Sequence, residues 1–258
     1  TLPEDLYAGL VADTNRVLYT VCCFSPGPAN RLFMRNPGMT GGGQINNYPA
    51  GNLPGFRPID IIDRFGDRRY VLVTTSGVFF TTDITTASPI VWAELGGAGA
   101  SPAGACGVKA SVPTATPDTP TFYVQAGICN ERTMGNSGDQ LWRFTGTDPS
   151  GTWQRIDNND SQTGGIGIFG VDPNNPNRLY ASNMRAPAAG GPRMVFSNNG
   201  GTNWNNDAEL DNLMTGGGVL RYRTERGPSN FTGFNGYPQP TLVAFDPDDA
   251  NILVAGGR

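Results

Sequence analysis

One unit recurs along this chain of 258 residues: four copies follow one another, and a fifth begins near the end. In the clearest copy, residues 171–180 read as an apolar strand, an Asp-Pro turn and the start of a second strand. Residues 194–196 and 197–204 continue as a third strand and a turn that ends at a tryptophan. Such a repeat constrains the fold more than any single residue, because each copy must pack on its neighbours in the same way.

The spacing of the copies indicates an all-β fold, a β-propeller of four-stranded blades. With Tyr19, Tyr70, Tyr123 and Tyr180 taken as equivalent, the steps are 51, 53 and 57 residues (70 − 19, 123 − 70 and 180 − 123). Four-stranded blades span about 40–50 residues, so the excess is expected in loops. We expect the blade repeats near residues 8–55, 56–105, 106–160, 161–240 and 241–258, the last of them incomplete.

About four and a half blades in one chain predict a partial ring. We therefore expect a single propeller domain or the N-terminal part of one. The remaining blades would come from further sequence or from another chain, because an incomplete ring exposes a sheet edge. A five-bladed ring closed by the N-terminal strand is an alternative, and so is a β-sandwich whose turns resemble one another by accident.

Local patterns favour strands along most of the chain. Residues 70–75 and 241–245 are rich in β-branched and aromatic side chains, as strands are. Residues 165–170 spell GxGxxG, but they run into an Asp-Pro turn and not into a helix, so a strand is expected there. Residues 208–214 are the best candidate for a short helix.

Residues 197–204, Ser-Asn-Asn-Gly-Gly-Thr-Asn-Trp, resemble the Asp box of the bacterial neuraminidase repeat, Ser-x-Asp-x-Gly-x-Thr-Trp. Weaker copies are residues 148–153 and residues 81–83, the latter with a displaced tryptophan. The chain thus resembles the Asp-box β-propellers of the sialidase and xyloglucanase type. In that family the acidic side chain caps a hairpin turn and the tryptophan packs between sheets. The resemblance implies structural roles for Asp83, Trp92, Asp148, Trp153, Ser197, Asn199, Gly201 and Trp204.

The resemblance does not extend to the catalytic residues of the family. The arginine triad and the tyrosine–glutamate pair of the sialidases have no residue-by-residue match in this chain. Residues 56–59, Phe-Arg-Pro-Ile, carry the letters of the sialidase Arg-Ile-Pro motif in a different order. The two catalytic aspartates of the xyloglucan hydrolases are not matched either. The resemblance therefore implies an architecture and leaves the activity open.

The composition excludes several kinds of chemistry. The chain has no histidine, which rules out Ser-His-Asp and Cys-His catalysis and histidine-ligated metals within these residues. A net charge of −4, with Lys109 as the one lysine, argues against a nucleic-acid partner. The sequence contains no run of 18 apolar residues, so no membrane-spanning helix is predicted. Carboxylates, arginines and aromatic residues remain, and these are the groups that recognise carbohydrates.

Four long loops are expected around the mouth of a central channel. They comprise residues 36–57, 96–105, 157–165 and 205–239, and they are rich in glycine. Long loops on a rigid scaffold commonly carry function. Within residues 57–64, Asp60 is a candidate acid or base and Arg57 a candidate anion clamp. A turn cap and a solvated arginine are the alternative interpretation.

Residues 221–226 form the second candidate cluster. On a strand, alternate residues share a face, so two arginines and a glutamate would lie together with the tyrosine opposite. An arginine there can bind a carboxylate through two hydrogen bonds. A self-paired, solvent-exposed charged ribbon is the alternative. The candidate catalytic residue is Glu225, and the candidate ligand-binding residues are Arg221, Tyr222 and Arg223.

The four cysteines suggest an oxidising compartment. Cys106 and Cys129 flank a predicted hairpin and would face each other, which predicts a disulfide. Cys22 and Cys23 are adjacent and form either a vicinal disulfide or two thiols. We expect an extracellular, periplasmic or cell-surface protein. No cofactor is expected; residues 157–160 offer oxygen ligands for calcium, although a polar turn explains them equally well.

These observations predict an exported propeller that binds a glycan or a surface protein through its long loops, without catalysis in this chain. A glycoside hydrolase of the Asp-box propeller type, with paired carboxylates, is the first alternative. A scaffold factor for a larger complex is the second. We expect no nucleic-acid partner in any of the three cases.

Overall fold

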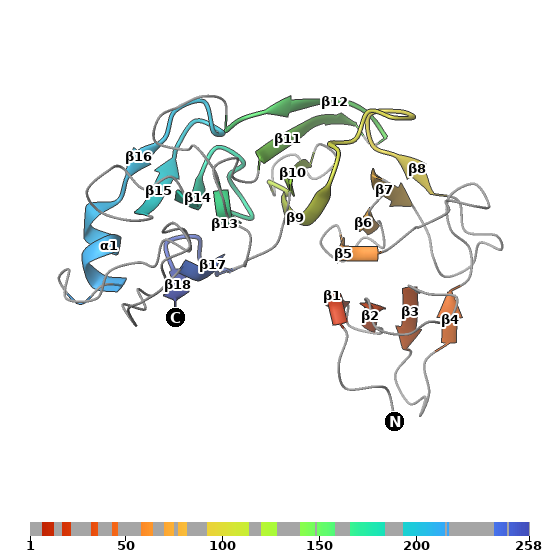
Figure 1. Cartoon of the computed structure of the whole chain (residues 1–258), viewed down its shortest axis with the longest axis horizontal. Helices are drawn as coiled ribbons and strands as arrows, with labels where there is room; N and C mark the ends of the chain where they lie inside the picture. Colours follow the sequence, from red (N-terminus) through yellow and green to blue (C-terminus); the bar gives the residue numbers. More distant parts are fainter. Residues whose placement is uncertain are drawn as a thin grey trace, which may run out of the picture. The chain divides into compact units, whose positions relative to one another are not determined.

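In the computed structural model, all but one of the described helices and strands are β-strands, which pair within five sheets (Figure 1). It describes residues 7–12, 17–21, 32–35, 43–45, 58–63, 70–74, 77–81, 92–113, 120–127, 140–147, 149–157, 166–183, 193–214, 216, 240–246 and 248–257. Within these ranges there is one α-helix, and none that is long and apolar enough to cross a membrane. The expectation that the chain folds mainly into β-strands is therefore confirmed for the described residues.

The first two sheets each hold four strands paired in chain order. The first consists of β1 (Tyr7–Ala12), β2 (Val17–Val21), β3 (Leu32–Arg35) and β4 (Gly43–Ile45). The second consists of β5 (Pro58–Asp63), β6 (Tyr70–Thr74), β7 (Gly77–Thr81) and β8 (Ala93–Glu94). Every neighbouring pair in both sheets is antiparallel, so each sheet is a meander in which strands adjacent in sequence pair.

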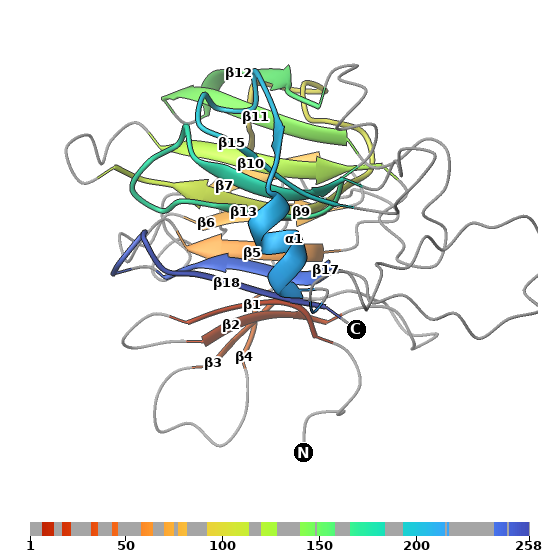
Figure 2. The same ribbon diagram turned by 90° about the vertical axis from the view of Figure 1, so that its left-hand side faces the viewer.

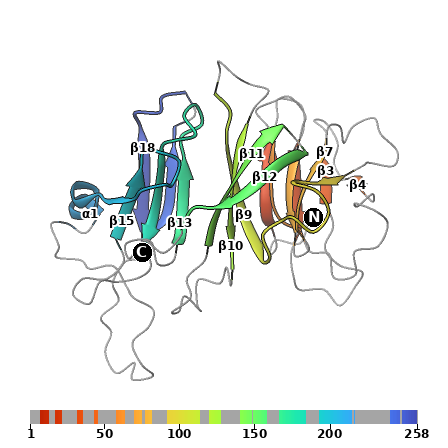
Figure 3. The same cartoon turned by 90° about the horizontal axis from the view of Figure 1, so that it is seen from above.

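The later sheets repeat this order. The third consists of β9 (Ala105–Ser111), β10 (Thr121–Ala126), β11 (Gln140–Thr147) and β12 (Ser150–Arg155), drawn in yellow and green in Figure 3. The fourth consists of β13 (Ile166–Val171), β14 (Leu179–Asn183), β15 (Arg193–Ser197) and β16 (Asn205–Asn206). The fifth pairs β17 (Pro240–Phe245) with β18 (Leu253–Gly257). The GxGxxG segment thus forms a strand, as predicted.

The chain divides into two compact units, and the division crosses the third sheet. The first unit comprises Thr1–Ala110, Asp118–Val124 and Phe144–Trp153. In it β1 lies beside β5, so the first strands of two successive sheets are neighbours. A buried core fills the space between the second and third sheets; it contains Val71, Val73, Val78, Phe80, Leu95, Ala105, Val108, Phe122, Val124 and Phe144.

The second unit comprises Ser111–Pro117, Gln125–Arg143 and Gln154–Arg258. Here β13 lies beside β17, again first strand against first strand. The approach is close, because a Cβ atom at Gly170 would lie 2.8 Å from Cγ1 of Val243. The glycines of the GxGxxG segment therefore include one that sheet packing requires.

The predicted helix is present as α1 (Ala208–Met214), which lies beside β15 and β18 (Figure 2). Its first turn is capped by Asp207, whose Oδ1 accepts a hydrogen bond from Leu210 N at 2.9 Å. Two of the long loops predicted from the sequence contain elements of secondary structure. Residues 36–57 contain β4, and residues 205–239 contain β16 together with the predicted helix.

The strand registers correct the sequence alignment of the repeats. Tyr70 pairs with Thr81 in the second sheet, whereas in the fourth sheet it is Leu179 that pairs with Ser197, the first residue of the box. Tyr70 therefore corresponds to Leu179 and not to Tyr180. A shift of one residue places a side chain on the opposite face of a sheet, so the two tyrosines have different surroundings.

Candidate functional site

Most residues of the two clusters predicted to bind ligand lie outside the described part of the chain. Asp60 is placed on β5, although its side chain is not described. The same holds for Cys106 on β9. The site that the structure does define is a network of polar residues at the turns between strands. Outside the described residues lie Arg57, Asp83, Asp148, Cys22, Cys23, Cys129, Arg221, Tyr222, Arg223, Glu225 and the segment 158–165.

The turn between β13 and β14 is organised by Asp172, which is 2% exposed. Its Oδ1 accepts hydrogen bonds from Asn174 N at 2.9 Å and from Asn175 N at 3.0 Å. Asn175 Oδ1 in turn accepts one from Asn177 N at 3.0 Å. The hairpin closes where Asp172 N donates to Arg178 O at 3.0 Å. These local bonds explain the Asp-Pro-Asn-Asn sequence, because side-chain oxygens satisfy the amides that the turn leaves unpaired.

The turn between β17 and β18 repeats this pattern. Asp246 Oδ1 accepts from Asp248 N at 2.8 Å and from Asp249 N at 3.0 Å. Asp249 Oδ1 accepts from Asn251 N at 2.9 Å, and Asp246 N donates to Ile252 O at 3.0 Å. Position by position these are the bonds of the preceding turn. The repeat seen in the sequence is thus also a repeat of hydrogen bonds.

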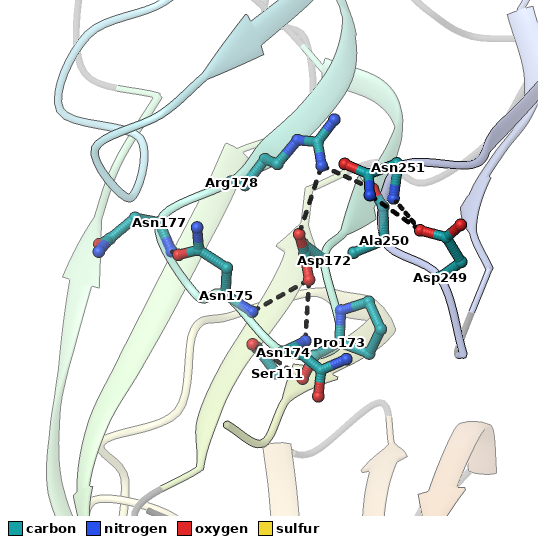
Figure 4. A network of polar contacts seen from close by, with 10 residues as sticks. All are labelled: Ser111, Asp172, Pro173, Asn174, Asn175, Asn177, Arg178, Asp249, Ala250 and Asn251. Atoms are coloured by element: carbon teal, nitrogen blue, oxygen red, sulfur yellow. Dashed lines mark hydrogen bonds and ion pairs between the residues drawn. The ribbon is translucent and has the colours of Figure 1, made fainter. Parts of the chain in front are cut away.

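Neighbouring turns are linked through Arg178 (Figure 4). Its Nη1 donates to Ala250 O at 2.6 Å and lies 3.6 Å from Asp172 Oδ2. Its guanidinium carbon lies 5.2 Å from the ring centroid of Phe245, within the range of a cation–π contact. On the other side of the same turn, Pro173 O accepts bonds from Val112 N at 2.8 Å and from Ser111 Oγ at 3.2 Å. One turn therefore joins three successive sheets.

The Asp box at residues 197–204 is a closed turn held by two side chains. Ser197 Oγ accepts from Asn199 N at 3.2 Å and from Gly201 N at 2.9 Å, and its hydroxyl donates to Asn199 Oδ1 at 2.9 Å. Asn199 Oδ1 also accepts from Asn203 N at 2.9 Å. Asparagine therefore supplies the acceptor oxygen that an aspartate would supply.

Two of the box tryptophans link their own sheet to the sheet before it. Trp204 Nε1 donates to Ile156 O at 3.2 Å, and Trp153 Nε1 donates to Leu95 O at 2.8 Å. Leu95 follows Trp92 by three residues, as Ile156 follows Trp153. The acceptor is thus the same position of the preceding repeat. Trp92 is itself 6% exposed. Trp153 and Trp204 thus make equivalent hydrogen bonds in two successive sheets.

The residues that follow these tryptophans also make one repeated bond. Leu95 N donates to Val78 O, Ile156 N to Leu141 O and Asp207 N to Met194 O, at 2.9, 2.8 and 2.9 Å. In each case the acceptor is the second residue of the third strand of its sheet. The fourth strand therefore ends in the same register in three successive sheets.

Tyr180 joins this framework to α1. Its hydroxyl donates to Asp207 Oδ2 at 3.1 Å, and its ring stacks on Phe196 with the centroids 5.8 Å apart. Phe245 contacts the same ring edge-on, at 5.9 Å. Burial and then the negative charge of Asp207 raise the pKa of Tyr180 above its ordinary value. Asp211 Oδ1 accepts from Met194 N at 2.8 Å, which fixes the helix on β15.

Two predicted loops have a carboxylate at or just before their first residue, and both carboxylates already accept hydrogen bonds within the protein. Glu94 accepts from Gly99 N at 2.7 Å and from Ser101 N at 3.1 Å, so it closes the loop of residues 96–105 on itself. Asp157, 3% exposed, pairs with Arg155 through two bonds of 2.7 and 2.8 Å. The bond to Asp157 raises the pKa of Arg155.

The carboxylates of this network take part in hydrogen bonds within the protein. Each buried or half-buried carboxylate among the side chains in the described ranges accepts hydrogen bonds from the protein itself. No group of three or more potential metal ligands occurs among the same residues. These carboxylates are Glu94, Asp157, Asp172, Asp207, Asp211 and Asp246.

Comparison with known proteins gives a likeness of fold. No protein-family model matches the sequence, and no curated protein matches it. An ancestral GH74 enzyme superposes with a TM-score of 0.52 at 13% identity, over 99% of this chain and 38% of that enzyme. This likeness supports a propeller-type β fold.

Two further structures are more distant. A putative 6-phosphogluconolactonase from Bacteroides uniformis gives a TM-score of 0.45 at 13% identity, over 79% of this chain and 54% of that chain. An α-L-arabinofuranosidase from Clostridium thermocellum gives 0.36 at 11% identity, over 78% and 71%. The chain therefore spans about half the length or less of the first two structures.

Proposed function

We propose that this chain is part of a glycan-binding propeller that does not itself cleave its ligand. The observation that carries the proposal is that the described buried and half-buried carboxylates bind groups of the protein itself. Asp172 and Asp246 cap turns, Asp207 caps a helix, and Asp157 is paired with Arg155. Glycoside hydrolysis needs two carboxylates that are free to exchange protons or attack the sugar, and these groups are committed to the framework.

A glycan is the favoured ligand because the residues predicted to bind ligand are arginines and a tyrosine. Arg221, Tyr222 and Arg223 combine an aromatic face with guanidinium groups, which suits a hydroxylated or acidic sugar. The net charge of −4 does not favour a polyanion, so contacts from specific arginines would have to provide recognition of an acidic sugar. The fold likeness to a GH74 enzyme agrees with a carbohydrate ligand.

A glycoside hydrolase is the second candidate. The same fold likeness favours it, since GH74 is a glycoside hydrolase family. In this case Asp60 and Glu225 are the residues to examine, one as acid and the other as base or nucleophile. A surface protein as partner is the third outcome that an experiment must separate.

The experiment is a binding screen by isothermal titration calorimetry against sialosides and against plant and microbial polysaccharides. The expected result is saturable heat with one ligand class, lost in Arg223→Ala and weakened in Tyr222→Ala. Lys109→Ala is the matched control. Lys109 is exposed on β9, and its substitution removes one positive charge, as Arg223→Ala does. Absence of binding to every glycan, or equal loss in the control, would contradict the proposal.

A further inference from the structure

We propose that the folded Asp box restrains spontaneous deamidation of Asn199 and yet accepts its product, the aspartate of a regular Asp box. In this chemistry the nitrogen of Gly200 attacks Cγ of Asn199, ammonia leaves, and a five-membered succinimide forms. Water then opens the ring to aspartate or isoaspartate. A glycine in the following position favours the attack because no side chain shields its nitrogen. The net reaction is a hydrolysis that consumes one water and releases ammonia. It involves no change of oxidation state, so it needs no oxidant, reductant or cofactor.

The turn is built to accept the aspartate product. Both side-chain bonds of Asn199 end on Oδ1, from Ser197 Oγ and from Asn203 N, each at 2.9 Å. No contact with another described residue uses its amide nitrogen. A carboxylate keeps both acceptor bonds and strengthens them through its charge. Asn199 is exposed, so the new charge stays hydrated. The conversion therefore leaves the turn intact.

The same turn holds the attacking nitrogen away from its target. Gly200 N donates to Asn177 O at 2.9 Å, and Gly200 O accepts from Arg143 Nη1 at 3.3 Å. Gly200 is thus fixed at both ends, in the left-handed conformation at φ 68°. Attack on Asn199 requires Gly200 N to leave Asn177. Deamidation in the folded chain therefore proceeds through local opening of the box and is slowed by the cost of that opening.

Isoaspartate is the product that the turn rejects. It adds one carbon to the backbone between residues 199 and 200. Asn199 O accepts from Thr202 Oγ1 at 3.0 Å and from Thr202 N at 3.4 Å, next to the bond from Gly200 to Asn177. A longer backbone cannot keep all three bonds. The two products should therefore differ in stability although they have the same mass.

The chain contains an internal reference for the rate measurement, because its other Asn-Gly pair is Asn235-Gly236. The protein is incubated at mildly alkaline pH in native buffer and in denaturing urea, and both sites are followed by peptide mapping and mass spectrometry. In urea the two pairs should react at similar rates. In native buffer, Asn199 should react at least about tenfold more slowly than in urea. Equal native and denatured rates at Asn199 would overturn the proposal.

Two variants separate the parts of the argument. Arg143→Ala frees Gly200 O and should accelerate deamidation of Asn199 in the folded protein. If that variant does not fold, wild-type protein in urea below its unfolding midpoint gives the same test, since local opening should raise the rate first. Asn199→Asp should unfold at the same urea concentration as wild type or a higher one, whereas Asn199→Ala unfolds at a lower one. An Asp variant as unstable as the Ala variant would refute acceptance of the product.

Discussion

Trp204 offers a direct test of the links between successive sheets. Its ring is 4% exposed, and its indole N–H donates to Ile156 O across 3.2 Å. Substitution by phenylalanine keeps an aromatic ring but removes this donor, which leaves a buried carbonyl without its partner. The lost bond costs about 1–3 kcal/mol, and the smaller ring costs roughly a further 1 kcal/mol of apolar burial. We expect Trp204→Phe to lower the free energy of unfolding by about 2–4 kcal/mol.

Trp142→Phe is the matched control. Trp142 also donates an indole hydrogen bond, at 2.9 Å, but its acceptor is Gln140 Oε1 on the same strand. This bond is partly exposed and links no second sheet, so its loss should cost only about 0.5–1.5 kcal/mol. Urea unfolding followed by far-UV circular dichroism compares the two variants without relying on tryptophan fluorescence. Equal losses in the two variants would refute the argument that the indole link stabilises the packing of the sheets.

Three further substitutions test the framework. Because the folded chain retains the Tyr180 proton longer than the unfolded chain, the free energy of unfolding should fall as pH rises above about 10; Tyr180→Phe should flatten that fall in urea midpoints measured at about pH 9 and pH 11. Gly201→Ala should be more destabilising than Gly97→Ala in thermal melts, since both glycines have positive φ but only the first would place a Cβ 2.5 Å from Ile156 Cδ1; equal melting temperatures would contradict the clash. Asp172→Ala should lower the free energy of unfolding by about 1–3 kcal/mol, and by more than Asp246→Ala, because of these two turn aspartates Asp172 is the buried one and the one that contacts an arginine. The reverse order in urea unfolding would show that the buried turn is not the more stabilising one.

The sequence predicted the repeated elements because the residues that form them are local. An Asp-Pro turn and a box that ends in tryptophan each bond mainly to their own neighbours, so a short motif contains most of the interaction. The strand interpretation of residues 165–170 and the short helix at 208–214 succeeded for the same reason. The box could be recognised although asparagine stands at position 199 where the pattern has aspartate, because the turn requires only an acceptor oxygen there.

The contacts between sheets were not predictable in the same way. Arg178 looks like an ordinary turn residue, yet it donates to Ala250, 72 positions further along the chain. The alignment of Tyr70 with Tyr180 failed because turns of different length shift the register, and a shift of one residue reverses the face. A sequence signal existed for the tryptophan links, because the acceptor always follows the previous tryptophan by three positions. It becomes visible only when the repeats are aligned on tryptophan.

One measurement tests most directly whether the loops bind a glycan that the chain does not cleave, while the carboxylates of the described residues hold the framework. The polysaccharide that binds the chain is incubated with it at binding saturation, and newly formed reducing ends are counted over time. The account predicts sustained binding without new reducing ends. Reducing ends that accumulate with wild-type protein and disappear in Asp60→Asn or Glu225→Gln would contradict it and identify a glycoside hydrolase.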